Sequence, residues 1–127
     1  GSTRLLRQTP LRRAEDAKHH TLLDERADLP LFRYWRDAPG GGDRLSFARI
    51  VRLGSIEAIR QRLLAGAGVG VIPRYLVKQD LAKRRLKQVF SSIEPQHDYF
   101  RLVFRADDPR RALFAPLADA LLAFPLR

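Results

Sequence analysis

The chain has 127 residues, of which 45% are hydrophobic, and 24 Lys and Arg stand against 14 Asp and Glu, a formal charge of +10. This length and composition suit one domain with its own core. The lack of cysteine excludes disulfides, thiolate nucleophiles and cysteine-ligated zinc. No apolar run approaches the roughly 18 residues of a membrane span, and the charged start lacks a signal-peptide core, so we expect a cytoplasmic protein.

The positive charge is spread along the sequence. Its densest stretch is Lys83-Arg84-Arg85 with Lys87. A solvated helix face explains these residues as well as an anionic partner does, so a basic nucleic-acid-binding domain remains an alternative that rests on charge alone. Gly1-Ser2 resembles what tag cleavage leaves behind, and we assign residues 1–2 to a tag remnant.

Apolar spacing predicts the first elements in chain order. We expect a short helix over residues 11–18 and a brief strand over residues 21–23. Residues 30–37 contain aromatic side chains typical of strands, yet the proline at their start and the spacing of their apolar residues favour a helix. Residues 39–42 are expected to be a loop, because three consecutive glycines cost too much backbone entropy inside a regular element.

The central stretch predicts a strand–helix–strand unit. Residues 47–53 are expected to form a strand, after which Gly54-Ser55 gives a turn and a helix N-cap. Gly66 and Gly68 are expected to end that helix, because glycine accepts the left-handed cap conformation. Residues 69–72 are wholly apolar, which is typical of a strand buried on both faces. The result is a right-handed βαβ unit with parallel strands.

The rest of the chain continues this alternation. Pro73 is placed to start another helix, and residues 86–90 and 97–105 are expected to be strands. Asp107-Asp108-Pro109 predicts the start of a last helix that runs to about Ala123. The apolar residues of that helix form one stripe, which must be buried on something: Leu113, Phe114, Leu117, Ala118, Leu121 and Leu122. Such alternation indicates an α/β fold, a mostly parallel sheet flanked by helices.

Catalytic and metal-binding patterns are weak. His19-His20 with Asp24 matches no standard zinc spacing, and no serine lies in a nucleophile-elbow sequence. The glycines of residues 65–70 follow a helix and precede a strand, the reverse of a dinucleotide-binding loop. We therefore expect no enzyme, no metal site and no cofactor.

The Gly54-Ser55 turn is the best-placed candidate for ligand contact. It follows a strand and opens a helix, at the carboxyl edge of an α/β sheet, where unpaired backbone N–H groups and the helix dipole favour an anion. Arg52 and Arg26 could neutralise a carboxylate nearby. Ser55 as a simple N-cap explains the same sequence, so both interpretations stay open.

Two consecutive runs resemble a known family. Residues 52–59 (RLGSIEAI) and 63–73 (LLAGAGVGVIP) look like the effector-domain segment of LysR-type transcription regulators: a strand, a small polar residue, a helix ending in an Ala-Gly-x-Gly turn, an apolar strand and a proline. Residues 81–89, the strand over residues 100–104 and the last amphipathic helix also lie where that family has equivalents. The resemblance covers nearly the whole chain.

The resemblance implies a fold like type II periplasmic binding proteins, in which two α/β subdomains hold a small effector in their cleft. It assigns residues 3–105 to the second regulatory subdomain and 106–127 to a C-terminal helix that packs in the first. DNA recognition is expected through a winged helix-turn-helix domain that this chain lacks. Ser55 matches the small polar residue that faces the effector, with Gly54 and Ile56 as backbone neighbours.

Two further expectations follow from this resemblance. With half of the usual cleft absent, affinity for an effector, expected to be anionic, should be weak or nil in isolation. The stripe of the last helix should be exposed or pair with another copy in a homodimer, through Leu113, Phe114, Leu117 and Leu121. A periplasmic solute-binding protein shares the fold and is the other alternative, which a signal peptide at the native gene start would distinguish.

Overall fold

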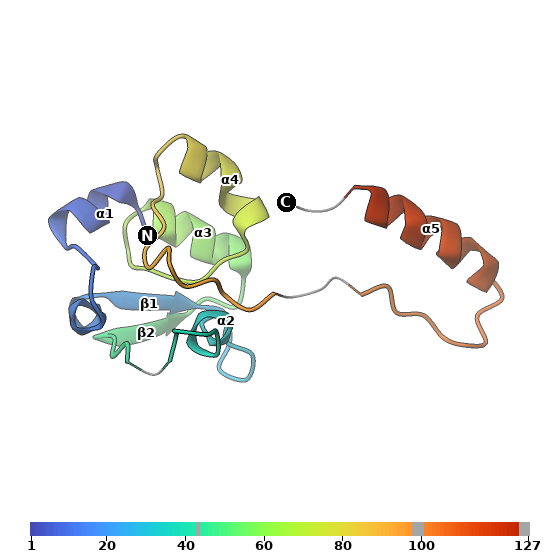
Figure 1. The fold of residues 1–127 in the computed structure, drawn as a ribbon, viewed down its shortest axis with the longest axis horizontal. Helices are drawn as coiled ribbons and strands as arrows, with labels where there is room; N and C mark the ends of the chain where they lie inside the picture. Colours follow the sequence, from blue (N-terminus) through green and yellow to red (C-terminus); the bar gives the residue numbers. More distant parts are fainter. Residues whose placement is uncertain (43, 98–100, 125–127) are drawn as a thin grey trace. The chain divides into compact units, whose positions relative to one another are not determined.

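The computed structural model describes residues 1–42, 44–97 and 101–124. The chain divides into two compact units, Gly1–His97 and Asp98–Arg127. The first unit contains α1 (Thr3–Gln8), the 3-10 helix η1 (Ala14–His19), β1 (Thr21–Asp24), α2 (Arg33–Arg36), β2 (Arg49–Arg52), α3 (Ile56–Leu64) and α4 (Arg74–Ala82) (Figure 1). The second contains α5 (Arg111–Ala123).

A small parallel sheet organises the first unit. β1 and β2 pair in parallel, with Thr21 opposite Arg49 and Asp24 opposite Arg52. On its other side β1 meets Val69, whose N–H donates to the Thr21 carbonyl at 2.9 Å and whose carbonyl accepts from Leu23 N at 2.8 Å. The strand–helix–strand unit from β2 through α3 to Val69 is therefore parallel, as predicted, and β1 lies between its two ends.

Each face of the sheet has its own core. Leu23 packs with Ile59 and Leu63 of α3 and with Val77 of α4, and Figure 1 shows both helices on one side of the strands. Successive strand residues point to opposite faces, so Leu22 and its bridge partner Val69 face the other side. There the buried cluster comprises Leu11, Ala17 and Val69, with Leu5, Leu6, Leu45, Phe47, Val89 and Phe90 packed around it.

The predicted helix over residues 30–37 is present as the single turn α2. Its Trp35 is 9% exposed. The Trp35 ring lies 5.7 Å from the Phe32 ring and 5.5 Å from the Phe90 ring, centroid to centroid. Aromatic burial therefore holds a segment that is too short to be stable as an isolated helix.

The glycines after α3 have two different structural roles: one ends the helix, and two allow a close approach to β1. Gly66 has φ +77 and ends the helix as predicted, because only glycine adopts this conformation without strain. Gly68 was expected to act in the same way, but its φ is not positive. A Cβ on Gly68 would instead lie 2.3 Å from the Thr21 carbonyl oxygen, and one on Gly70 would lie 2.6 Å from that of Leu23. These two glycines let the segment after α3 approach β1 closely.

A buried carboxylate joins α3 to α4. Asp80 is 0% exposed. Its Oδ2 accepts a hydrogen bond from Arg60 Nε at 2.9 Å, and its Oδ1 accepts from the Arg85 guanidinium. Both arginines retain solvent contact. The charge of Asp80 is therefore compensated on two sides, as a buried charge must be.

The N-terminal helix α1 was not predicted. Ser2 caps it, since the Ser2 hydroxyl accepts from Leu5 N at 3.2 Å. Ser2 is 3% exposed and forms an antiparallel bridge with Leu86. Apolar periodicity could not reveal a helix of only six residues.

The next helix begins later than expected, at Ala14, and is of the 3-10 type. Asp16 Oδ2 accepts hydrogen bonds from Arg13 N at 2.9 Å and Arg12 N at 2.8 Å. These two bonds lower the pKa of the Asp16 carboxyl group, the bond from Arg13 contributing most. They also satisfy backbone donors just before the helix, which fixes its start.

Several predicted strands are shorter than expected or absent. The strand expected over residues 47–53 is reduced to Arg49–Arg52, and those over 69–72 and 86–90 to single bridges at Val69 and Leu86. Residues 101–105 have no strand, and 98–100 lie outside the described residues. A β-ladder needs a partner along its whole length, and within the described residues the expected strands have one over only part of theirs or none at all.

The second unit consists of an irregular segment and α5. α5 ends at Ala123, as predicted, but begins at Arg111, because Asp108 instead closes a turn by accepting from Arg110 N at 2.9 Å. The Phe104 ring packs on Phe114 of this helix, with ring centroids 4.5 Å apart. No helix within the described ranges is long and apolar enough to span a membrane.

Candidate functional site

The carboxyl ends of β1 and β2 lie at the same edge of the parallel sheet. The strands end opposite each other at Asp24 and Arg52. Their pairing continues into the following loops, where Leu53 N donates to the Asp24 carbonyl and Gly54 N donates to the Glu25 carbonyl, each at 3.0 Å. The turn before α3 and the loop after β1 are thus held side by side, at the edge where ligands usually bind in α/β sheets.

Gly54 and Ser55 form the turn that was expected here. Gly54 has φ +65, and a Cβ at this position would meet no atom within 4 Å, so backbone conformation rather than space requires glycine. Ser55 caps α3: its hydroxyl accepts from Ala58 N, but at 3.4 Å, which is long for an N–H···O bond. Gly54 and Ser55 are exposed, and Ile56 is half-buried. The Ser55 hydroxyl therefore keeps hydrogen-bonding capacity toward solvent.

The Asp24 carboxylate holds the loop that follows β1, over residues 25–31, by hydrogen bonds to its two ends. Asp24 is 3% exposed. Its Oδ1 accepts from Glu25 N at 2.8 Å and from Leu31 N at 2.7 Å, which draws the two ends of the loop together. Sequence reasoning assigned no such role to Asp24. The available signal was an acidic residue directly after a buried apolar strand.

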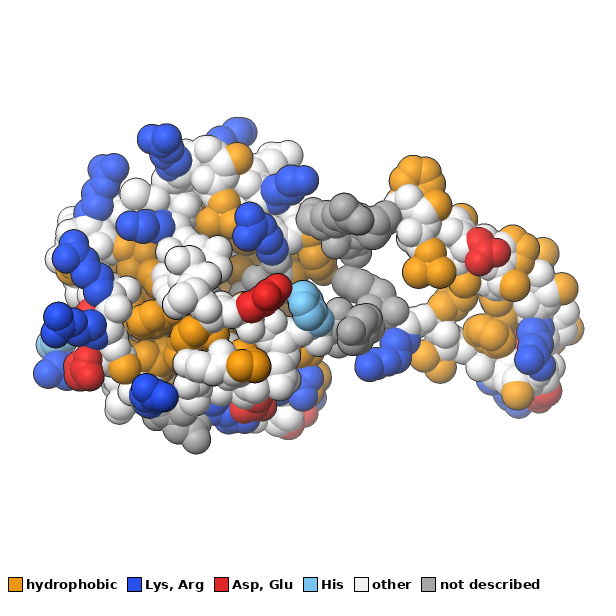
Figure 2. Space-filling model, in the orientation of Figure 1, with side chains coloured by type: hydrophobic (Ala, Val, Ile, Leu, Met, Phe, Trp, Pro, Cys, Tyr) orange, Lys and Arg blue, Asp and Glu red, His pale blue; other side chains and the backbone are white. Residues whose placement is uncertain are grey.

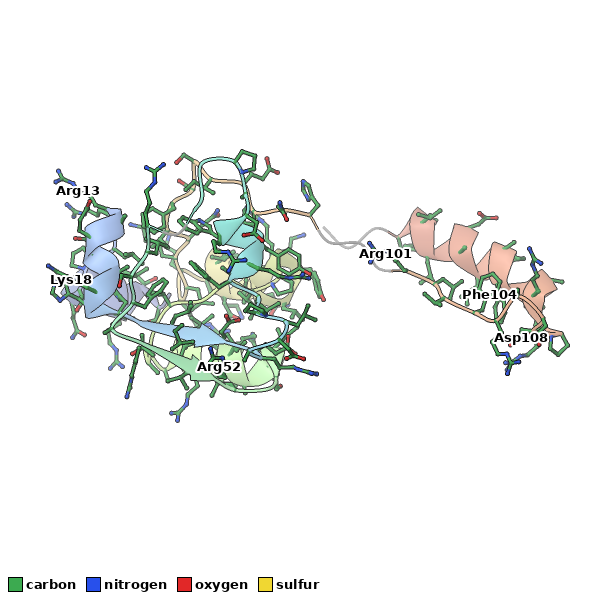
Figure 3. The ribbon with its side chains drawn as sticks, turned by 90° about the horizontal axis from the view of Figure 1, so that it is seen from below. Arg13, Lys18, Arg52, Arg101, Phe104 and Asp108 are labelled. Atoms are coloured by element: carbon green, nitrogen blue, oxygen red, sulfur yellow. The ribbon has the colours of Figure 1, made fainter. Side chains whose placement is uncertain are left out.

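The two predicted arginines differ in their surroundings. Arg52, labelled on β2 in Figure 3, is exposed, and no ion pair joins its guanidinium within the described part of the chain. Arg26 donates to both carboxylate oxygens of Asp28, at 3.0 and 2.6 Å. This pairing raises the pKa of Arg26 and lowers that of Asp28, so the charge of Arg26 is already balanced locally.

One acidic side chain lies in the first turn of α3. Glu57 Oε1 accepts from Gln61 Nε2 at 2.6 Å and from Arg60 Nη1 at 3.0 Å. These bonds, that from Gln61 first, lower the pKa of Glu57 and keep it ionised. They also draw its carboxylate along the helix toward Arg60, so that part of its charge is compensated there.

The residues predicted to form an oligomer interface lie on α5. Leu113, Leu117 and Leu121 are 66%, 46% and 58% exposed. Phe114 is half-buried beneath Phe104. Three of these four side chains therefore have apolar surface that the described residues of their own unit leave uncovered.

The histidine pair takes part in no cluster of metal ligands in the part of the chain that the structure describes. His20 is 2% exposed, and its two ring nitrogens lack a hydrogen-bond partner among the described residues, whereas His19 lies on the surface. Within those same ranges, no three His, Cys, Asp or Glu side chains group closely enough to hold a metal ion.

Comparison with known sequences decides the family. The profile described as LysR substrate binding domain matches residues 2–124, nearly the whole chain. The chain belongs to this family. The LysR substrate-binding domain has the type II periplasmic-binding-protein fold. The parallel sheet and flanking helices of this chain agree with the α/β fold class expected from sequence. These domains are the effector-binding parts of transcription regulators and are not enzymes.

A bacterial regulator supports the assignment. Over 35 residues, 28% of this chain, the sequence is 49% identical to the "Uncharacterized HTH-type transcriptional regulator YwqM" of Bacillus subtilis (strain 168). The matched stretch spans 12% of the length of that regulator. No solved structure matches the chain.

Proposed function

We propose that this LysR substrate-binding domain senses a small anionic effector at the carboxyl edge of β1 and β2, within a transcription regulator that binds DNA through another domain. The Ser55 hydroxyl carries the proposal, because it is exposed at the start of α3 and only loosely bonded to Ala58 N, at 3.4 Å. It can donate to a ligand oxygen while the amides of the first turn favour negative charge.

The charges around this edge support an anion, with Arg52 as its main counter-charge. Arg52 belongs to the last pair of the sheet, opposite Asp24, and has no ion-pair partner among the described residues. Arg26 would first have to leave Asp28, so we expect it to contribute less. Glu57 opposes an anion, but its bonds to Gln61 and Arg60 offset part of its charge.

The proposed mechanism is a shift of population between two closures of the effector cleft. An effector that contacts Ser55 and the opposite subdomain favours the closed form, and the closed form repositions the DNA-bound oligomer. The effector changes the equilibrium only by its difference in affinity for the two forms. Because such a regulator acts on DNA, we place it in the cytoplasm.

Titration of the isotope-labelled chain with acetate, succinate and citrate tests the site. We expect weak binding, with midpoints in the millimolar range, because one subdomain supplies only half of the contacts. Amide chemical shifts should change over residues 25–31 and 53–57. Ser55→Asp keeps a good N-cap but adds a negative charge, so it should lose these changes, whereas Ser55→Thr should keep them.

Two results of this titration would contradict the proposal. One is a set of shift changes that lies elsewhere in the first unit, for example around α1 and α4. The other is an unchanged response in Ser55→Asp, which would mean that the serine serves only as a cap.

We further propose that residues 3–105 and 106–127 act as separate parts and that the chain forms a homodimer through α5. The exposed Leu113, Leu117 and Leu121 support the dimer, since contiguous apolar surface usually marks an interface. Light scattering at high concentration should give a dimer mass, and Leu117→Ser with Leu121→Ser should give a monomer. Val103→Ser, at an apolar residue that is 83% exposed and lies outside α5, is the control. A monomeric wild-type chain would disprove the dimer.

A further inference from the structure

We propose that the first unit also carries a basic groove, formed by Arg4, Arg7, Arg84 and Arg85, that contacts the phosphodiester backbone of duplex DNA. The arginines come from α1 and from the turn after α4, about 80 positions apart in the sequence. They line one open hollow of about 720 Å³, and none of the residues that line it is acidic. Figure 2 shows Lys and Arg side chains over the surface where Figure 1 places α1 and α4.

Backbone contacts hold the two sides of the groove together. Thr3 donates from its hydroxyl to the Arg84 carbonyl at 2.6 Å and from its N–H to the Arg85 carbonyl at 2.9 Å. The neighbouring bridge between Ser2 and Leu86 extends this connection. The start of α1 is therefore fixed against the turn, which positions the arginines before any partner binds.

The four guanidinium groups differ in how far they are engaged. Arg4 donates to the Ala65 carbonyl at 3.1 Å, a bond that leaves its charge uncompensated, while Arg85 shares the carboxylate of Asp80. Arg7 and Arg84 are exposed and have no ion pair within the described residues. Arg84 also has φ +55, a left-handed conformation that costs free energy in a residue other than glycine.

The shape and charge of the groove favour a polyanion over a small metabolite. Small-molecule sites are enclosed and mostly apolar, whereas this hollow is open and is lined largely by cationic and polar side chains. Exposed arginines bind successive phosphates by releasing counterions, without reading base sequence. The choice of DNA among polyanions rests on the proposed function, since a DNA-bound regulator brings its sensing domain close to the duplex.

Fluorescence anisotropy with a labelled duplex of arbitrary sequence tests the groove. Arg7→Ala with Arg84→Ala should weaken binding by the 127-residue chain about tenfold at low salt and lower the slope of log affinity against log salt by about two. Arg13→Ala with Lys18→Ala removes the same charge from the N-cap and the body of η1, at two residues labelled in Figure 3, and should change affinity less than twofold. All four side chains are exposed, so both variants should keep the thermal midpoint of the wild type.

Three outcomes would overturn the proposal: no salt-dependent binding by the wild-type chain, equal losses in the two variants, or tighter binding to polyglutamate than to the duplex. The last would identify an acidic protein segment as the partner. The carboxylate titration at Ser55 is independent of these arginines, so failure of either experiment leaves the other interpretable.

Discussion

Replacing Asp80 by alanine is expected to lower the free energy of unfolding by about 3 kcal/mol, one of the two largest effects that we expect on stability. The side chain is fully buried and connects Arg60 of α3 with Arg85 after α4. Its removal leaves a buried cavity. It also leaves the guanidinium groups of Arg60 and Arg85 without the carboxylate to which both donate. Urea unfolding followed by circular dichroism gives the change directly.

Glu57→Ala provides a matched control for Asp80, since both carboxylates bond to Arg60. Glu57 lies on the surface, with 59% of its side chain exposed, and surface ion pairs contribute little. The urea midpoint of this variant should match that of the wild type. Equal destabilisation by the two substitutions would show that the burial of Asp80 is not what matters.

Gly68→Ala is expected to destabilise the first unit by about 2 to 3 kcal/mol. The added Cβ would lie 2.3 Å from the Thr21 carbonyl oxygen, and both partners in this contact are held by the bridge between β1 and Val69. The backbone segments that contain Gly68 and Thr21 must therefore separate, which breaks the hydrogen bonds of Val69 with Thr21 and Leu23. Thermal and urea unfolding both measure the loss.

Gly54→Ala separates backbone conformation from steric contact. Gly54 has φ +65 but open space around its Cβ position, so alanine there should cost only about 1 kcal/mol. If Gly68→Ala is tolerated as well as Gly54→Ala, the close approach to β1 does not constrain residue 68.

Local signals in the sequence predicted the turn and the helix at the candidate site. A turn glycine followed by a capping serine and an amphipathic helix is encoded within about ten residues, and the structure has Gly54, Ser55 and α3 in those places. Gly68 shows the limit of such reasoning. Its position next to a helix end suggested a cap, while the contact that requires glycine involves Thr21, far away in the sequence.

Long-range arrangements could not be predicted in the same way. Basic residues are distributed along the whole sequence. Only the packing of α1 against the turn after α4 brings Arg4 and Arg7 together with Arg84 and Arg85. Sequence likewise placed Arg26 near the site but could not show that Asp28 already pairs with it. Each of these depends on backbone geometry that no local pattern encodes.

The expected strands were too long for a related reason. Apolar runs such as residues 69–72 indicate burial, but ladder length depends on a neighbouring strand. Val69 has its neighbour in β1, whereas the residues after it have no ladder partner within the described part of the chain. Hydrophobicity thus identified the buried segments without determining how far each pairs.

The inducer response of the regulator that contains this domain tests the central claim most directly. A reporter screen with individual organic acids first identifies an inducing acid, and Ser55→Ala is then compared with Ser55→Thr under that acid. We predict that Ser55→Ala abolishes the response while binding to the operator stays intact, and that Ser55→Thr, which keeps the hydroxyl, responds. An unchanged response in Ser55→Ala would contradict a role for this edge in effector sensing.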